Sequence, residues 1–345
     1  MSDRPGPGRN RANRRESASR VTLSPVTSRR VGPGPAAAWT GESGAATQTG
    51  ARVVNMSLGL APSDGGDPVS RTLDRLSART GALFTVAAGN SGEDQAVVAP
   101  AVADAALAVG SVTEDGRLSG FSTRGPRQGD RAVKPEVAAV GSGVVSTRAE
   151  STPAGDFPSS EPGDGPVDAW YTRMSGTSMA APQVAGVAAV LAAAHPGWRA
   201  PRLKAALMSS AVPVAGVSGA GQGAGVVRLE RVLAQTVTAT TGSLAVVSRW
   251  PGRRTLSRTV AFHNAGREPV ELALDVRLVD GFGEPVETAA VRSRGPLRVT
   301  PGGSARTTVE FRSEELPTGQ YSGWLTASGA GQRVSVPFTL YAESG

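Results

Sequence analysis

The chain has 345 residues, no cysteine and a formal net charge of +7. This length allows two ordinary domains, and the absence of cysteine excludes disulfides and thiolate metal sites. We find no apolar run of 18 residues and therefore predict no membrane span. The start of the chain shows no apolar core of a signal peptide, so the sequence leaves the localisation open.

Most of the positive charge lies at the start of the chain. Residues 1–31 contain eight arginines against Asp3 and Glu16, with no aromatic residue among them. Basic segments can bind nucleic acid, but without interleaved aromatic residues we expect a solvated arm and no specific nucleic-acid partner. Residues 1–44 also lack a sustained apolar period, so they cannot bury enough surface to offset the entropy lost on ordering. We predict a disordered basic tail over 1–44.

Residues 45–235 alternate short apolar strands with helical patterns. The predicted elements are, in chain order, a strand at 52–58, a helix at 67–79 that ends at Gly81, strands at 82–88 and 105–112, and helices at 178–194 and 201–211. Strands separated by helices are typical of a parallel α/β sheet. The helix at 178–194 is apolar on every side, so we expect it to be buried centrally. The glycine-dense stretch 216–225 follows no strand, and we predict a turn there.

From about Gln235 onward the apolar period becomes two. Short strands are predicted at 257–262, 270–278, 304–311 and 333–340, separated by Gly/Pro turns. This pattern is typical of a β-sandwich of about 100 residues. The predicted fold class is therefore α/β, with a parallel sheet flanked by helices over 45–235 and an all-β sandwich over 236–345.

The segment Met174-Ser-Gly-Thr-Ser-Met-Ala-Ala-Pro182 places Ser178 at the start of the apolar helix. A hydroxyl at this position lies beside backbone N–H groups that have no helical partner, and at the positive end of the helix dipole. Both features can stabilise an oxyanion that forms next to the serine. Taken alone, a serine at such a position is more commonly an N-cap.

A second polar residue follows the strand at 82–88. The segment Val86-Ala-Ala-Gly-Asn-Ser-Gly92 places Asn90 just beyond the carboxyl end of this strand, the edge where parallel α/β sheets bind their ligands. Its side-chain amide can donate a hydrogen bond to a developing oxyanion. Taken alone, such an asparagine is a turn residue.

Five motifs resemble those of the subtilisin-like serine peptidases and occur in the order of that family. They are Asn55-Met-Ser-Leu-Gly59, Ala87-Ala-Gly-Asn-Ser91, Phe121-Ser-Thr-Arg-Gly-Pro126, Lys134-Pro-Glu-Val137 and Gly176-Thr-Ser-Met-Ala-Ala-Pro182. The resemblance covers about residues 45–235. It implies the C-terminal part of a subtilase catalytic domain, of peptidase family S8. The sandwich that follows resembles the fibronectin-III-like modules found after many subtilase domains.

The resemblance also implies roles for single residues. Ser178 would be the nucleophile, and Asn90 would donate a hydrogen bond to the oxyanion. The implied substrate-binding residues, which pair with an extended polypeptide or line the pocket for the residue before the scissile bond, are Ser57, Leu58, Gly59, Ala87, Ala88 and Gly89. No cofactor is implied. No acidic cluster has the ligand spacing of a calcium site, so we assign no metal.

The sequence departs from the family in its catalytic base. The family supplies its triad in the order Asp, His, Ser, so the first two should precede Asn55. Residues 1–54 contain no histidine, and Asp3 is their one aspartate. The two histidines of the chain, His195 and His263, follow the serine, and we expect surface or packing roles for both. We therefore predict a serine endopeptidase homologue that is inactive as this chain.

Other interpretations stay open. An esterase of the α/β-hydrolase type needs a G-x-S-x-G elbow, but Ala180 stands at its last position. The missing histidine favours a non-catalytic pseudo-protease or binding module. The abrupt start of family-like sequence near Ala45 favours a truncated or frame-shifted gene product. Without the strands that the family places beside it, the Val53-Val54 strand would form a bare apolar edge, from which we expect self-association.

Overall fold

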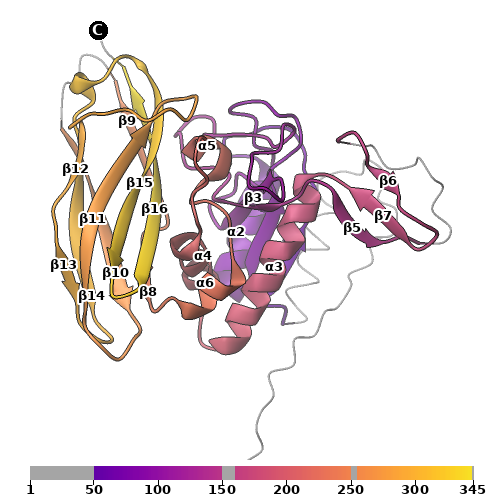
Figure 1. Ribbon diagram of the computed structural model, residues 1–345, viewed down its shortest axis with the longest axis horizontal. Helices are drawn as coiled ribbons and strands as arrows, with labels where there is room; N and C mark the ends of the chain where they lie inside the picture. The colour runs from indigo at the N-terminus through magenta and orange to yellow at the C-terminus, as the bar shows by residue number, and fades with distance from the viewer. Residues whose placement is uncertain (1–49, 150–159, 250–254, 344–345) are drawn as a thin grey trace, which may run out of the picture.

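The computed structural model describes residues 50–149, 160–249 and 255–343. Figure 1 shows three parts side by side: an α/β body in the middle, a β-sandwich on one side of it, and a small three-stranded arm on the other. The tail predicted over 1–44 lies outside the described residues.

A four-stranded parallel sheet forms the centre of the body. Its strands lie in the order β1–β2–β3–β4 and comprise Val53–Met56, Leu83–Ala87, Ala106–Val112 and Val137–Val140. Every residue of β2 and β3 is buried, as expected for central strands that helices cover on both faces. The α/β class and the first three strands are confirmed. Strand β4 was not predicted.

Helix α2 (Pro68–Thr80) covers one face of the sheet and has clear sequence signals at both ends. The carboxylate of Asp67 accepts hydrogen bonds from the N–H groups of Val69 and Ser70, at 3.0 and 2.9 Å, and so caps the first turn. Gly81 ends the helix in the left-handed conformation, with φ at 77°, which glycine adopts without strain. Both ends lie within one residue of the prediction.

Helix α3 (Thr177–Ala194) lies across all four strands on the other face, with α4 (Ala200–Ser210) beside it (Figure 1). Seven of its 18 residues are buried, while Val190 is 38% exposed. The helix therefore has the central position expected of it against the sheet, but it is not fully buried, because one side of α3 faces outward. Among the described residues α3 is the one helix long and apolar enough to cross a membrane by composition alone; here it packs against the sheet.

The glycine-dense stretch 216–225 is more ordered than the predicted turn. It contains the short helix α5 (Gly219–Gln222), and α6 (Leu229–Ala234) follows it. The buried side chain of Gln222 accepts from the N–H of Val214 at 2.6 Å and donates to the carbonyl oxygens of Val214 and Val217 at 2.9 and 2.7 Å. These bonds hold the glycine-rich backbone in place.

Nine strands form the sandwich. One sheet has the order β12–β14–β10–β8, and the other β13–β11–β15–β16–β9. The four predicted strands are confirmed as β10 (Leu256–Asn264), β11 (Val270–Val279), β14 (Ser304–Phe311) and β16 (Gln332–Ala342). The strands not predicted are β8 (Val237–Ala239), β9 (Leu244–Ser248), β12 (Val291–Ser293), β13 (Leu297–Val299) and β15 (Gly319–Gly329). The two sheets enclose one apolar core. Likeness to a fibronectin-III-like module stays a prediction.

The sandwich is docked on the body through buried hydrogen bonds. The indole N–H of Trp324 donates to the carbonyl oxygen of Gly223 at 2.8 Å, and the backbone N–H of Ala239 donates to the Ser209 hydroxyl at 2.9 Å. Helix α4 packs against β8 and β16. The sandwich therefore shares a packed interface with the body.

The arm was not predicted. It consists of β5 (Val144–Thr147), β6 (Gly165–Pro166) and β7 (Tyr171–Met174), with β7 in the middle. Strand β7 leads directly into the segment that begins α3. The carboxylate of Asp164 fixes this junction, because it accepts from the Ser175 N–H at 3.1 Å and from the Ser175 hydroxyl at 2.8 Å.

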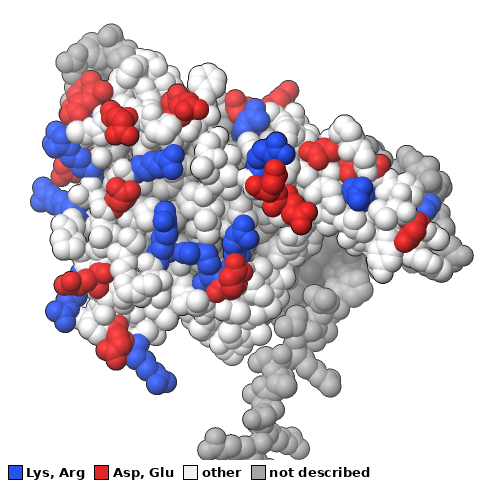
Figure 2. Space-filling model, in the orientation of Figure 1, with Lys and Arg blue, Asp and Glu red and all other residues white. Residues whose placement is uncertain are grey.

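Charged side chains of both signs are mixed on the face shown in Figure 2. Acidic and basic groups alternate over the sandwich and the body, and they form no extended region of one sign on this face. Opposite charges that lie close together largely cancel each other's field at a distance. The described part of this face therefore presents a mixed surface potential.

The two lysines of the chain share one buried carboxylate. The ammonium groups of Lys134 and Lys204 each lie 2.6 Å from Glu136 Oε1, and the backbone N–H of Ala108 donates to Glu136 Oε2 at 2.7 Å. Lys134 is 2% exposed, and this burial lowers its pKa to about 8. The cluster joins β3, β4 and α4, because Lys204 lies on α4 and Glu136 directly precedes β4.

We expect Glu136→Gln to lower the free energy of unfolding by about 3–5 kcal/mol, since it leaves buried ammonium groups without their counter-charge. Denaturant titration of the full chain measures this loss. The matched control is Glu310→Gln, which removes a surface ion pair with Arg294 at 3.4 Å and should cost no more than about 1 kcal/mol. Equal losses in the two variants would contradict the structural role of the cluster.

Candidate active site

Ser178 lies in the first turn of α3 but is not its N-cap. Gly176 holds the cap position, and no side chain caps the helix. The Ser178 hydroxyl faces the segment after β1, where it donates to the carbonyl oxygen of Ser57 at 3.4 Å. The interpretation of Ser178 as a capping serine is therefore wrong. Its hydroxyl is half-exposed beside the positive end of the helix dipole.

Asn90 follows the end of β2, and its side chain is held by the start of α3. The backbone N–H and the hydroxyl of Thr177 both lie within hydrogen-bond distance of Asn90 Oδ1, at 2.9 and 2.8 Å. Because the oxygen of the amide is turned toward Thr177, its nitrogen points away from that residue. A Cβ on Gly176 would lie 3.2 Å from Asn90 Nδ2, so the glycine leaves the amide nitrogen uncovered on that side.

The segment after β1 completes this edge of the sheet. The Ser57 hydroxyl donates to the carbonyl oxygen of Ser178 at 2.8 Å and accepts from Asn55 Nδ2 at 3.0 Å. Ser57 and Gly59 are exposed, and Leu58 is half-buried. The structure thus brings the ends of β1 and β2 and the start of α3 together at the edge formed by the carboxyl ends of the parallel strands.

The segment after β2 contributes backbone more than side chains. Ala87 and Ala88 are buried in the apolar cores on opposite faces of the sheet, so their methyl groups do not face the edge. Gly89 is half-buried, and its N–H donates to the Thr177 hydroxyl at 3.2 Å. Of the three residues predicted to line a pocket after β2, Gly89 is the one at the surface.

Both histidines lie far from Ser178. His195 follows the last residue of α3 and stacks on Trp198, with ring centroids 3.9 Å apart. Burial, and after it the Arg202 charge, lowers the pKa of His195. Seventeen residues at 1.5 Å rise place it about 25 Å from Ser178 along the helix. His263 lies on β10 in the sandwich. Neither imidazole can take a proton from the Ser178 hydroxyl in this structure.

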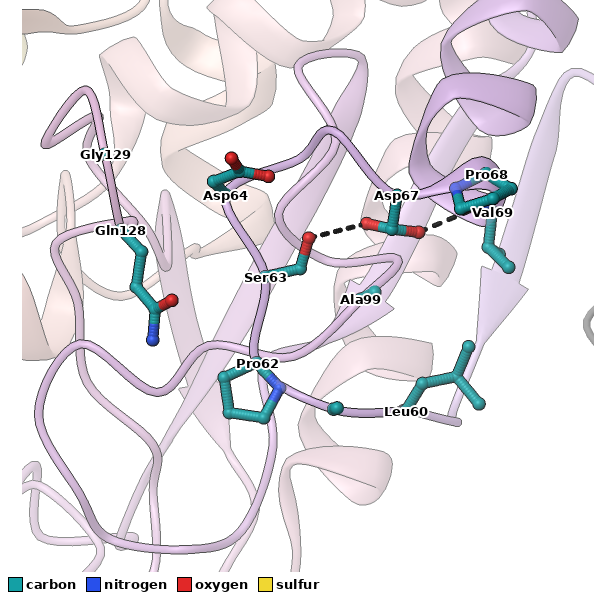
Figure 3. Close-up of a pocket in the computed structure, with 11 residues that line it drawn as sticks. Leu60, Pro62, Ser63, Asp64, Asp67, Pro68, Val69, Ala99, Gln128 and Gly129 are labelled. Carbon is teal, nitrogen blue, oxygen red and sulfur yellow. Dashed lines mark hydrogen bonds between the residues drawn. The ribbon is translucent and has the colours of Figure 1, made fainter.

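A cavity of about 620 Å³ lies beside the segment that continues from Gly59. Figure 3 shows Leu60, Pro62 and Ala99 along it, with Asp67 at the start of α2. The Asp67 carboxylate is already engaged by the Ser63 hydroxyl at 2.8 Å and by the first turn of α2. Ser178 and Asn90 are not among its lining residues. No group of three or more His, Asp or Glu side chains within the described ranges is arranged to hold a metal ion.

Thr177 is the residue of this edge that the sequence interpretation missed. Its two contacts with Asn90 and its contact with Gly89 make it the link between β2 and α3. The sequence signal that could have identified Thr177 was its position between Gly176 and Ser178, at the first residue of the helix. A threonine there has both a free backbone N–H and a hydroxyl to offer to a neighbouring strand end.

Comparisons with known proteins show the family of this chain. The family model described as "Subtilase family" matches residues 8–240. This match begins within the tail predicted over 1–44. The minor extracellular protease Vpr of Bacillus subtilis (strain 168) is 28% identical over 231 residues, covering 65% of this chain and 27% of Vpr. Subtilisin DY of Bacillus licheniformis is 34% identical over 169 residues, covering 48% of this chain and 52% of that protein.

The solved structures that match part of this chain include the self-cleaved protease domain of PatA, at 25% identity and a TM-score of 0.44, with 57% of this chain and 66% of that chain covered. The prenylagaramide maturation protease PagA gives 24% identity and a TM-score of 0.46, with 58% and 67% covered. The matches span about a quarter of Vpr and half of subtilisin DY. Because the family model matches more than half of the chain, the chain belongs to the subtilase family.

Proposed function

We propose that this chain carries the nucleophile and oxyanion-hole part of a subtilisin-like serine endopeptidase. In this proposal Ser178 is the nucleophile and Asn90 Nδ2 donates to the oxyanion. An extended polypeptide substrate pairs with Ser57, Leu58 and Gly59, and Gly89 borders the pocket for the residue before the scissile bond. The Oδ1 contacts of Asn90 with Thr177 carry the proposal, because they leave the amide nitrogen free on the side of Gly176.

The chemistry of acyl transfer explains why these groups belong together. A tetrahedral intermediate at the substrate carbonyl develops negative charge on its oxygen, and donors held in place before the reaction stabilise that charge. The uncapped start of α3 supplies backbone N–H groups and the positive end of a dipole. Asn90 adds a side-chain donor from the neighbouring strand end. These parts act on the oxyanion and not on the serine proton.

We further propose that this chain does not hydrolyse peptides by itself. A serine hydroxyl is a weak nucleophile until a base takes its proton. Within the described residues the Ser178 hydroxyl donates its hydrogen bond to the Ser57 carbonyl oxygen. A carbonyl oxygen is too weak a base to remove the proton of the serine. His195 and His263 are both remote from it. These positions also favour the second candidate function, a non-catalytic pseudo-protease or binding module that binds peptides without cleaving them.

We expect no labelling of Ser178 by a fluorophosphonate probe and no measurable peptide cleavage. In subtilisin, a member of the same family, removing the triad lowers kcat by about 10⁶-fold, which equals about 8 kcal/mol of transition-state stabilisation. Mass spectrometry of the probe-treated full chain measures labelling, and a fluorogenic peptide measures cleavage.

The controls for this experiment are Ser178→Ala and Ser146→Ala, the latter at an exposed serine of the arm. Rapid labelling of the folded wild type that Ser178→Ala abolishes and Ser146→Ala keeps would contradict the proposed inactivity. Such a result would show that a base reaches Ser178, and the nucleophile role itself would then be supported.

Self-association through the edge of the parallel sheet is a further proposal. Strand β1 is one of the two edge strands of this sheet among the described residues, with β2 as its one neighbour. Val53 and Val54 are half-buried, and Asn55 is exposed. Exposed strand edges pair with other chains, so we expect oligomers of the purified chain in sedimentation velocity.

Asn55→Lys places a charge on this edge and should increase the monomer fraction. Ser257→Lys, at an exposed position of β10, is the matched control and should leave the distribution unchanged. A monodisperse wild-type monomer with a sharp cooperative melt would refute the proposal.

A further inference from the structure

Two segments, which we call the two walls, contact the start of α3 near Asn90. One is the segment after β1, which Ser57 fixes to Ser178 by its hydroxyl bond of 2.8 Å. The other is the segment after β2, which Gly89 fixes to Thr177 by its N–H bond of 3.2 Å. In the proposed function a peptide carbonyl oxygen meets Asn90 Nδ2, and the side chain of the residue that carries this carbonyl enters between the two walls. We call this residue the P1 residue.

Val98 lies between the two walls, and its main chain is held to both of them. Its N–H donates to the carbonyl oxygen of Ala88 at 3.2 Å on one side. On the other side Val98 forms an antiparallel bridge with Pro62, and the N–H of Ala99 donates to Ala61 at 2.9 Å. The backbone of Val98 therefore cannot retreat without breaking contacts with both walls.

The side chain of Val98 reaches both glycines of the walls. A Cβ on Gly59 would collide with Val98 Cγ2, and a Cβ on Gly89 would lie 3.3 Å from Val98 Cγ1. The two methyl groups thus occupy the space that the missing side chains of these glycines leave open. Val98 as a whole is half-buried.

We propose that Val98 makes the P1 pocket shallow and thereby selects peptides with glycine, alanine or serine at P1. This inference rests on the proposed function and names the substrate class of the same site. An aromatic ring or a long aliphatic or basic side chain at P1 would need the volume that the isopropyl group fills. In apolar pockets a difference of one methylene changes selectivity by about 10–200-fold.

The test is a titration of the isotope-labelled full chain with two product-type peptides, acetyl-Ala-Ala-Ala and acetyl-Ala-Ala-Phe, followed by NMR. We expect the peptide that ends in alanine to bind at least about tenfold more tightly to the wild type. Val98→Gly opens the pocket and should raise the affinity for the phenylalanine peptide by about tenfold. Val98→Thr keeps the branched shape and should keep the wild-type preference.

Val145→Gly, the same substitution at an exposed position of the arm, is the matched control and should keep the wild-type preference. If Val98→Gly does not fold, Val98→Ala takes its place. It opens the pocket by a smaller amount and should also raise the affinity for the phenylalanine peptide. Equal binding of both peptides to the wild type, or an unchanged preference in the opened variants, overturns the role of Val98 while the peptide site stands. If neither peptide shifts the resonances of Asn90 and of Ser57–Gly59, the proposed function fails, and the role of Val98 fails with it.

Discussion

The hydrogen bonds between Thr177 and Asn90 Oδ1, at 2.9 and 2.8 Å, tie the start of α3 to the end of β2. A side-chain amide has an accepting end and a donating end, so occupation of the oxygen decides where the nitrogen points. Here it leaves Nδ2 on the side of Gly176, next to Ser178. The part proposed for Asn90 in stabilising an oxyanion depends on this orientation, since an amide turned the other way would present an acceptor to a developing negative charge.

The scaffold keeps this contact in place by burying what surrounds it. Strands β2 and β3 are buried along their whole length, so the end of β2 cannot shift without disturbing both apolar cores. Helix α3 packs across the four strands, and the cluster of Lys134, Lys204 and Glu136 joins the sheet to α4. The docked sandwich adds further contacts to α4 and to the glycine-rich loop. The site is thus supported by rigid elements, which favours preorganised donors.

Helices and strands whose ends are marked by local sequence signals were predicted close to their observed bounds. Asp67 and Gly81 mark the ends of α2 because a cap and a left-handed glycine act through adjacent backbone groups. Strand β4 escaped prediction because a short apolar run has the same appearance in a strand and in a buried helix. The outward side of α3 was missed because its alanine-rich sequence does not tell which side meets the sheet. The short helix α5 depends on the buried Gln222 side chain, a long-range effect that composition does not reveal.

The candidate site shows the same difference between local sequence signals and long-range contacts. Ser178 and Asn90 could be proposed from the sequence because each stands at the end of an element, where unpaired backbone groups and ligands gather. Thr177 was missed, and the role proposed for Val98 was not foreseen, because both depend on what these side chains touch across the fold. Thr177 contacts a residue 87 positions away, and Val98 lies in a loop without a motif, where only the packed structure brings it against Gly59 and Gly89.

The side-chain amide resonances of Asn90 test the central claim most directly. We would record them in the wild type and in Thr177→Val, before and after addition of acetyl-Ala-Ala-Ala, whose carboxylate stands in for the oxyanion. The account predicts a downfield shift of an Asn90 Nδ2 proton in the wild type and a much smaller shift in Thr177→Val, which lacks the hydroxyl bond. Unmoved Asn90 resonances, in a wild type whose Ser57–Gly59 signals do shift, would contradict it.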